Sequence, residues 1–181
     1  MNAMKTNPGT RTALFVSALL FVPAVGCGVS VEADIPDVEV TQRGLTFDGV
    51  PNATIDTSMT KSYSQQHGKL DLPDGLDSEV KTLSATLRAT AGVDDLSFIQ
   101  HLRITMAPDG GGQPIELGTY APAGTPAGKE LTLTTLNPVN VLDAWKTESA
   151  IFTVEIAGTL PSTSWTADVI VHFAGSARYK Y

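Results

Sequence analysis

The stretch WTADVIVHF, residues 165–173, is the clearest strand pattern in the chain. Apolar residues occupy every second position, namely Trp165, Ala167, Val169, Val171 and Phe173. Thr166, Asp168 and His172 lie between them, and Ile170 is the one apolar exception. Because successive side chains of a strand point to opposite faces, this alternation predicts a strand with one buried and one solvated face. Such strands are typical of antiparallel sheets.

Shorter segments with the same alternation precede this stretch. They lie at residues 38–47, 60–70, 80–89, 102–106, 115–117, 131–133 and 152–156. In the third segment the residues expected on one face are Leu83, Ala85, Leu87 and Ala89. The Gly-rich turn at Asp109–Gly112 predicts one hairpin, since glycine adopts a positive φ at no steric cost, and the loop Gly158–Ser164 predicts a second.

Helix is scarce in this pattern. Residues 139–146, VNVLDAWK, are the best candidate, with Val141 and Trp145 at helical spacing, and residues 94–100 fit a single turn. Seven or eight strands at this spacing with one short helix predict an antiparallel β-sandwich, and a small β-barrel is the alternative. We expect residues 37–181 to form one domain.

The N-terminus has the order of features that protein export needs. Residues 1–12 carry two cations and no acid, residues 13–25 form an apolar stretch, and small residues follow at once. Positive charge holds the N-terminus on the cytoplasmic side while the apolar segment enters the translocation machinery. We therefore expect residues 1–26 to be a signal peptide, starting at Met1 or Met4.

The expected cleavage region is Ala24-Val25-Gly26-Cys27, and it resembles the lipobox of bacterial lipoproteins. That family most often has Leu at the first position, so Ala24 departs from the pattern while the other three residues match it. The resemblance covers only the leader. It implies a diacylglycerol on the thiol of Cys27, cleavage before this residue, and stable membrane anchoring by two or three acyl chains. Gly28, in place of Asp, implies the outer membrane.

Two other interpretations of the leader remain open. Residues 13–31 carry no charge and approach the length of a membrane-spanning helix, although two glycines and a proline weaken the second half. An ordinary secretory signal, cut near Gly26 or Ser30, would leave Cys27 incidental and the protein periplasmic or secreted. If the lipid is attached, residues 27–36 form a short lipidated tether.

The charge balance argues against nucleic acid as a partner. The chain has 12 Lys+Arg against 19 Asp+Glu and a net charge of −7, and Lys5 and Arg11 lie in the leader, so the mature body is more acidic still. The remaining cations are dispersed, and an acidic surface repels phosphate backbones. The single Cys allows neither an intrachain disulfide nor a thiolate metal site.

Motifs of catalysis are missing from the sequence. His67, His101 and His172 form no pair at a spacing that would place two of them together on one strand or helix. The sequence contains no nucleophile elbow, P-loop or dinucleotide fingerprint. We expect a protein that is not an enzyme and needs no cofactor or metal, with His172 facing solvent.

The densest group of acids lies in the segment DLPDGLDSE and comprises Asp71, Asp74, Asp77 and Glu79. Calcium takes about six to eight oxygen ligands, and such a loop could supply several of them. The spacing is not that of an EF-hand, however, and acids in a loop are more often simply solvated. This segment is a weak candidate for ligand binding.

An exposed aromatic ring is the other candidate for ligand binding. Tyr120 opens the Pro/Gly-rich loop Ala121–Lys129, where it could stack on the apolar face of a sugar. Trp145 and Trp165 lie on the apolar sides of their elements, so we expect both in the core.

Two hypotheses of function follow from these features. The first is a membrane-anchored lipoprotein of the cell envelope whose β-sandwich is not an enzyme and has a structural or protein-interaction role. The second is a ligand-binding module of the envelope, for sugar, lipid or calcium. In both, the membrane is contacted through the N-terminal lipid, and an envelope protein is a candidate partner.

Overall fold

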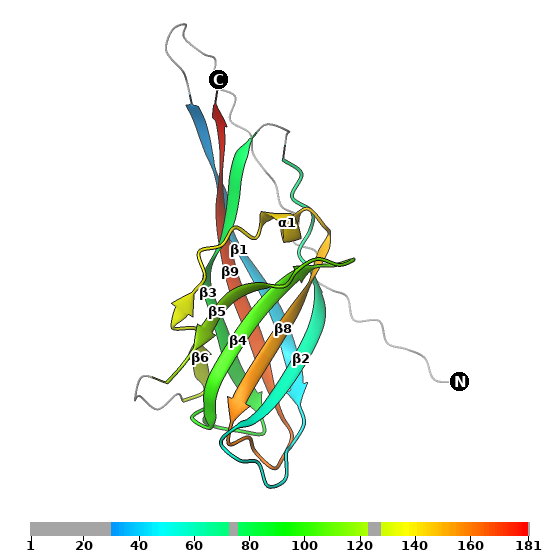
Figure 1. The fold of residues 1–181 in the computed structure, drawn as a ribbon, viewed down its shortest axis with the longest axis vertical. Coiled ribbons are helices and arrows are strands. Elements are labelled where there is room, and N and C mark those ends of the chain that lie inside the picture. The colour runs from blue at the N-terminus through cyan, green and yellow to red at the C-terminus, as the bar shows by residue number, and fades with distance from the viewer. Residues whose placement is uncertain (1–29, 73–75, 123–127, 181) are drawn as a thin grey trace, which may run out of the picture.

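The computed structural model describes residues 30–72, 76–122 and 128–180. Within them, nine strands form two antiparallel sheets packed face to face, with one short helix, α1 (Leu142–Trp145) (Figure 1). The β-sandwich predicted from the alternating segments is therefore confirmed. No helix in these residues has the length and hydropathy needed to span a bilayer.

Each strand belongs to one of the two sheets. The four-stranded sheet has the order β1 (Ser30–Phe47), β9 (Trp165–Lys180), β3 (Asp77–Ala91) and β6 (Glu130–Thr132). The five-stranded sheet has the order β2 (Thr57–Gln66), β8 (Ser149–Gly158), β4 (Ile99–Pro108), β5 (Ile115–Tyr120) and β7 (Thr135–Leu136). Among the described strands the chain stays in one sheet only from β4 to β5 and from β7 to β8, and every other connection crosses to the opposite sheet. Two packed antiparallel sheets joined in this way resemble a jelly roll.

The connection from β8 to β9 differs from the prediction. β8 pairs with β2 and β4, whereas β9 pairs with β1 and β3, so residues 159–164 cross between the sheets and are not a hairpin turn. The chain leaves β8 at Gly158, where a Cβ would lie 2.0 Å from the carbonyl oxygen of Phe98. Leu160 then packs into the core. The hairpin between β4 and β5 is confirmed.

β1 begins earlier than the sequence predicts. Residues 30–36, expected to be tether, pair with β9 from Ser30 opposite Lys180 to Ile35 opposite Gly175. These residues form a strand because β9 continues as far as Lys180 and its backbone groups pair with theirs. The bulge that follows contains Pro36, whose missing N–H suits an edge strand.

A second bulge changes which residues of β3 are buried. The register shifts between Thr82 and Ser84, so one extra residue is inserted and the alternation changes phase there. Leu83, expected on the buried face, is 51% exposed, and the inward position before the bulge belongs to Thr82. Beyond the bulge, Ala85 and Leu87 are buried as predicted.

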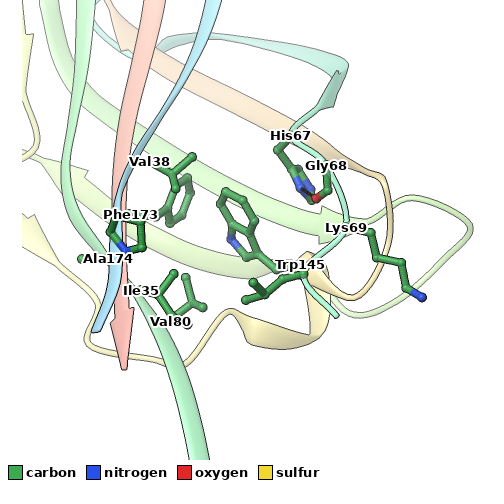
Figure 2. Close-up of a pocket in the computed structure, with 11 residues that line it drawn as sticks. Ile35, Val38, His67, Gly68, Lys69, Val80, Trp145, Phe173 and Ala174 are labelled. Carbon is green, nitrogen blue, oxygen red and sulfur yellow. Dashed lines mark hydrogen bonds between the residues drawn. The ribbon is translucent and has the colours of Figure 1, made fainter. Parts of the chain in front are cut away.

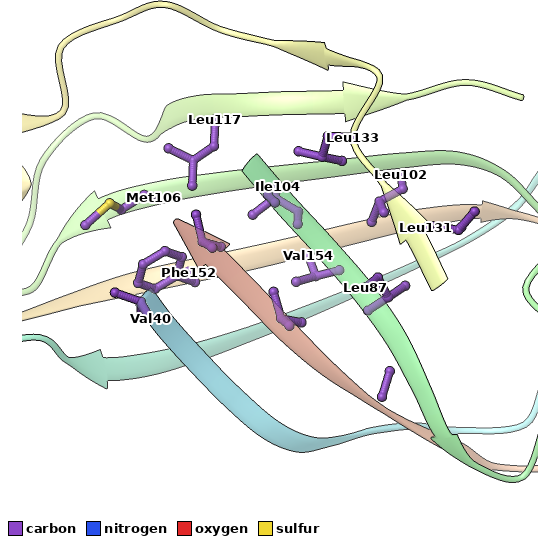
Figure 3. Close-up of a cluster of buried hydrophobic side chains, with 14 of the residues drawn as sticks. Val40, Leu87, Leu102, Ile104, Met106, Leu117, Leu131, Leu133, Phe152 and Val154 are labelled. Carbon is purple, nitrogen blue, oxygen red and sulfur yellow. The ribbon is translucent and has the colours of Figure 1, made fainter. Parts of the chain in front are cut away.

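The core lies between the two sheets and takes side chains from both. Figure 3 shows Val40 and Leu87 from the four-stranded sheet facing Ile104 and Val154 from the five-stranded sheet. At one end of the sandwich, Phe47 and Trp165 stack with ring centroids 4.3 Å apart. The predicted inward face of β9 is buried throughout, at Trp165, Ala167, Val169, Val171 and Phe173.

Neighbouring residues of β8 provide a test of this packing. Phe152 is fully buried and Ile151 is 36% exposed on the opposite face. We expect Phe152→Ala to lower the free energy of unfolding by about 3–5 kcal/mol, because it leaves a cavity in the core. Ile151→Ala should change it by about 0.5 kcal/mol or less. Denaturant unfolding followed by tryptophan fluorescence measures both, and equal losses would contradict this assignment of faces.

Candidate functional site

The two sheets differ in length at one end of the sandwich. There β1, β9 and β3 continue past the five-stranded sheet as a three-stranded arm, residues 30–38, 77–82 and 173–180, seen beyond α1 in Figure 1. The inner face of the arm is apolar near its base, where Val80 and Phe173 are buried. An apolar face without an opposing sheet needs another cover.

That cover is α1 together with residues 67–72, which follow β2. The side chain of Asn140 fixes α1 to β3, because its Oδ1 accepts hydrogen bonds from the backbone N–H of Val80 (2.9 Å) and of Leu142 (3.0 Å). Its Nδ2 donates to the carbonyl oxygen of Ser78 (3.0 Å). The N–H of Leu70 donates to the carbonyl oxygen of Trp145 (2.8 Å), which joins the two covering segments.

A cavity of about 170 Å³ remains between the cover and the arm (Figure 2). Its walls are mostly apolar, with Ile35, Val38, Val80 and Phe173 contributed by the arm. Trp145 and His67 are contributed by the cover. An engineered apolar cavity of about 150 Å³ admits one benzene ring, so this cavity has room for a ligand of that size.

Trp145 is the central side chain of the cavity wall. The residue is 4% exposed, and its ring meets Phe173 edge to face, with centroids 5.3 Å apart. Figure 2 shows the indole nitrogen on the edge of the ring directed toward Ile35 rather than toward His67. This buried N–H has no hydrogen-bond partner among the described residues.

His67 lines the cavity beside Trp145. Its ring lies 4.4 Å from that of Trp145, and its Nδ1 is 2.7 Å from the carbonyl oxygen of Gly68. A carbonyl only accepts, so Nδ1 carries the proton and donates, and Nε2 of the neutral ring is an acceptor. Nε2 is buried and also has no partner in the described structure. Burial lowers the pKa of His67, which favours this neutral form.

The charged groups at the rim of the cavity neutralise each other. Lys69 lines the opening, but its Nζ lies 2.6 Å from Oδ1 of Asp71, and this hydrogen bond raises the pKa of Lys69. Figure 2 shows its amino group pointing away from Trp145. The described lining is therefore mostly apolar, and its one charged side chain is turned toward the rim.

The structure does not bring the described members of the predicted acidic group together as a metal site. Asp71 pairs with Lys69, and Glu79 lies on β3 with its Oε2 2.8 Å from Nζ of Lys81. Asp77 is on the same strand, and Asp74 lies outside the described residues. In the part of the chain that is described, no three His, Cys, Asp or Glu side chains gather closely enough to hold a metal ion.

The expectation of an exposed ring at Tyr120 is wrong, since the residue is 8% exposed and belongs to the core. The register of β5 against β4 shifts at Leu117, where β5 has one extra residue. The alternation changes phase there, so Gly118 and Tyr120 face inward. Residues 123–127 of the following loop lie outside the described residues.

The remaining candidate residues have simple placements. Cys27 lies outside the described residues. His172 lies on the outer face of β9, with its ring nitrogens 3.6 Å from Asp37 and 3.8 Å from Glu39. Both tryptophans are buried as predicted. The sequence did not single out His67, because its role depends on Trp145, which is distant in the chain and adjacent in space.

Comparisons with known proteins add little to this description. No protein-family model and no curated protein matches the chain. The decameric BFDV capsid protein has 10% sequence identity and a TM-score of 0.39, and the match covers 79% of this chain and 99% of that chain. The structure of FlhE has 13% identity and a TM-score of 0.31, with coverage of 83% and 98%. Desmodium yellow mottle tymovirus has 12% identity and a TM-score of 0.34, with coverage of 91% and 95%. At these values the likenesses carry no argument about function.

The partial burial of His67 predicts a pH dependence of stability. Its pKa in the folded chain lies below the usual histidine value of 6.5, so the unfolded chain binds the proton first. Stability is therefore lost as the pH falls below 6.5, and the loss levels off below the lowered folded pKa.

We expect His67→Gln to lose less stability than the wild type between about pH 7.5 and about pH 5.5. Denaturant unfolding at several pH values measures this difference. His101→Gln, on the exposed side of β4, is the matched control, and its stability should depend on pH as that of the wild type does. If the stability of His67→Gln also changed with pH as in the wild type, this histidine would not be held neutral by burial.

Proposed function

We propose that this chain is a lipid-anchored protein of the bacterial cell envelope that is not an enzyme and binds a small, largely apolar molecule in the Trp145 cavity. The observation that carries the binding role is the mostly apolar cavity of about 170 Å³ between the arm and its cover.

The lining has the character of a small-molecule site. Ligand pockets are mostly apolar and carry a small number of polar groups that orient the ligand. Here Val38, Val80 and Phe173 supply apolar surface, and Lys69 is the one charged side chain among the described lining residues. The volume of about 170 Å³ limits the enclosed part of the ligand to about one ring.

The anchor is proposed from the leader, whose cleavage region resembles a lipobox at Cys27. The first residue of β1, Ser30, is only three positions later and lies at the outer end of the arm. A link of three residues spans at most about 11 Å. In this proposal the arm and the cavity face the membrane, which we take to be the outer membrane.

A role in protein contact is the second candidate. β2 is the edge strand of the five-stranded sheet, and its ten residues pair on one side only, with β8. An unpaired strand edge can accept a strand of another protein by backbone hydrogen bonding. Its exposed residues include Ser58, Thr60 and Ser62, so this edge favours a polar contact.

Benzene tests whether the cavity binds an apolar molecule. With the full-length chain labelled on tryptophan nitrogen, we expect benzene to shift the indole signal of Trp145 saturably while that of Trp165 stays unchanged. Val38→Phe should abolish the shift, because the larger side chain fills the cavity.

Leu83→Phe is the matched control, since it adds an aromatic ring at an exposed position of β3 and should leave binding intact. Equal shifts of both indole signals, or binding that survives Val38→Phe, would contradict a site in this cavity.

Labelling with radioactive palmitate in the native bacterium tests the anchor. The wild type should be labelled and sediment with membranes, and Cys27→Ala should be unlabelled and keep its leader. Ser17→Ala, in the apolar stretch of the leader, is the control and should be labelled like the wild type. Label that persists in Cys27→Ala would exclude a thiol-linked anchor at this residue.

A further inference from the structure

We propose that the outer face of the four-stranded sheet carries a second binding site, which takes a neutral saccharide chain lying across the strands. The site is a groove of about 400 Å³, here called the outer groove, lined by side chains from β1, β9, β3 and β6. It shares no described lining residue with the Trp145 cavity. Small-molecule sites in proteins have volumes of about 300–1,000 Å³, and the outer groove falls within this range.

The outer groove exists because a row of short side chains runs across the sheet between two rows of longer ones. In the middle row, Ile170 of β9 lies opposite Thr41 of β1 and Thr86 of β3. Residues on one face of a strand repeat about every 7 Å, so the two outer rows stand about 14 Å apart with the short row as the floor. The outer rows contain Glu39 with His172, and Asp168 with Arg88 and Glu130.

Ile170 gives the floor of the outer groove an apolar centre. It is the apolar exception in the alternation of β9, and it lies partly exposed on the solvated face. The hydroxyl groups of Thr41 and Thr86 flank it on the neighbouring strands. A sugar ring has apolar C–H faces and a polar hydroxyl edge. A ring lying on Ile170 would bury an apolar face there and direct its hydroxyl groups toward the polar side chains around it.

Hydrogen bonds hold two carboxylates of the outer groove in place. Oε1 of Glu130 accepts from Nε of Arg88 at 2.6 Å, and Oδ1 of Asp168 accepts from the backbone N–H of Gly44 at 2.8 Å. A carboxylate has about four acceptor positions, so each retains several for the hydroxyl groups of a ligand. Groups that are already held in position lose less conformational freedom when a ligand binds.

Arg43 supplies hydrogen-bond donors to the outer groove. It lies in the bulge of β1 between Gln42 and Leu45, and bulges commonly redirect a side chain. Its guanidinium group has no ion pair or hydrogen bond within the described residues and lines the groove. Arginine offers up to five N–H donors and no acceptor, so the group that meets Arg43 is an oxygen of the ligand.

The balance of charges favours a neutral ligand over an acidic one. Besides one histidine, the described lining has three carboxylates and two guanidinium groups, namely Glu39, Glu130, Asp168, Arg43 and Arg88. An acidic polysaccharide would bring its carboxylates close to those of the groove, and like charges repel. A neutral saccharide needs only donors and acceptors, and the outer groove presents both.

Titration of the isotope-labelled full-length chain with maltohexaose and cellohexaose tests the proposal. These probes contain the same sugar in a curved and in an extended chain, so the test does not depend on one chain shape. We expect at least one of them to shift the backbone amide signals of Thr41, Thr86 and Ile170 saturably, with a dissociation constant of about 1 mM or lower. The signals of Ser62 and Thr153, on the outer face of the other sheet, should stay unchanged.

Ile170→Arg should abolish binding, because a longer, charged side chain then occupies the floor of the groove. Ile151→Arg is the matched control, since it makes the same change at a partly exposed isoleucine of β8, on the other sheet, and should bind like the wild type. Arg43→Ala removes an exposed side chain that the fold does not use, and it should weaken binding by about tenfold, the size of one hydrogen bond to a charged group.

The proposal is wrong if neither neutral probe shifts these amide signals at about 10 mM, or if Ile170→Arg binds like the wild type. Hexagalacturonate is the acidic counterpart and should bind more weakly than the neutral probes. Tighter binding of this acidic chain would overturn the preference for a neutral ligand. Val38→Phe, which fills the Trp145 cavity, should leave saccharide binding unchanged, so the outer groove and the proposed apolar site are tested separately.

Discussion

The apolar inner face of the long strands β1, β9 and β3 must be covered where the five-stranded sheet ends, and this requirement shapes one end of the molecule. Most of the sandwich satisfies it by packing sheet against sheet, as Val40 and Phe152 do across the core. At the base of the arm the second sheet is missing. A four-residue helix and the segment after β2 take its place, and they fill the space less completely than a sheet does.

The cover is held by hydrogen bonds rather than by helix propensity. A helix as short as α1 is not stable by itself, because the cost of nucleation is not repaid over one turn. Asn140 compensates by bonding to the backbone of β3 on one side and to the start of the helix on the other. This clamp places Trp145 over the arm, where its ring forms part of the cavity wall.

Ion pairs contribute less to the fold than this packing does. Arg103 pairs with Glu116 and Glu155, and all three side chains are about 40% exposed. Exposed pairs of this kind are worth about 0–1 kcal/mol each. The apolar core and the backbone ladders therefore hold the sandwich together.

The sequence by itself determined the strands, their inward faces and the β-sandwich, because alternation is a local pattern that the pleat of a strand converts directly into a buried side. The proposed lipid attachment at Cys27 also rests on the sequence alone, because it is argued from neighbouring residues of the leader. Only the tertiary structure decided what depends on distant partners: the bulges that exposed Leu83 and buried Tyr120, the crossing from β8 to β9, and the meeting of His67 with Trp145. A bulge is set by the partner strand and a cavity by unequal sheet lengths, and neither leaves a periodic mark in the chain.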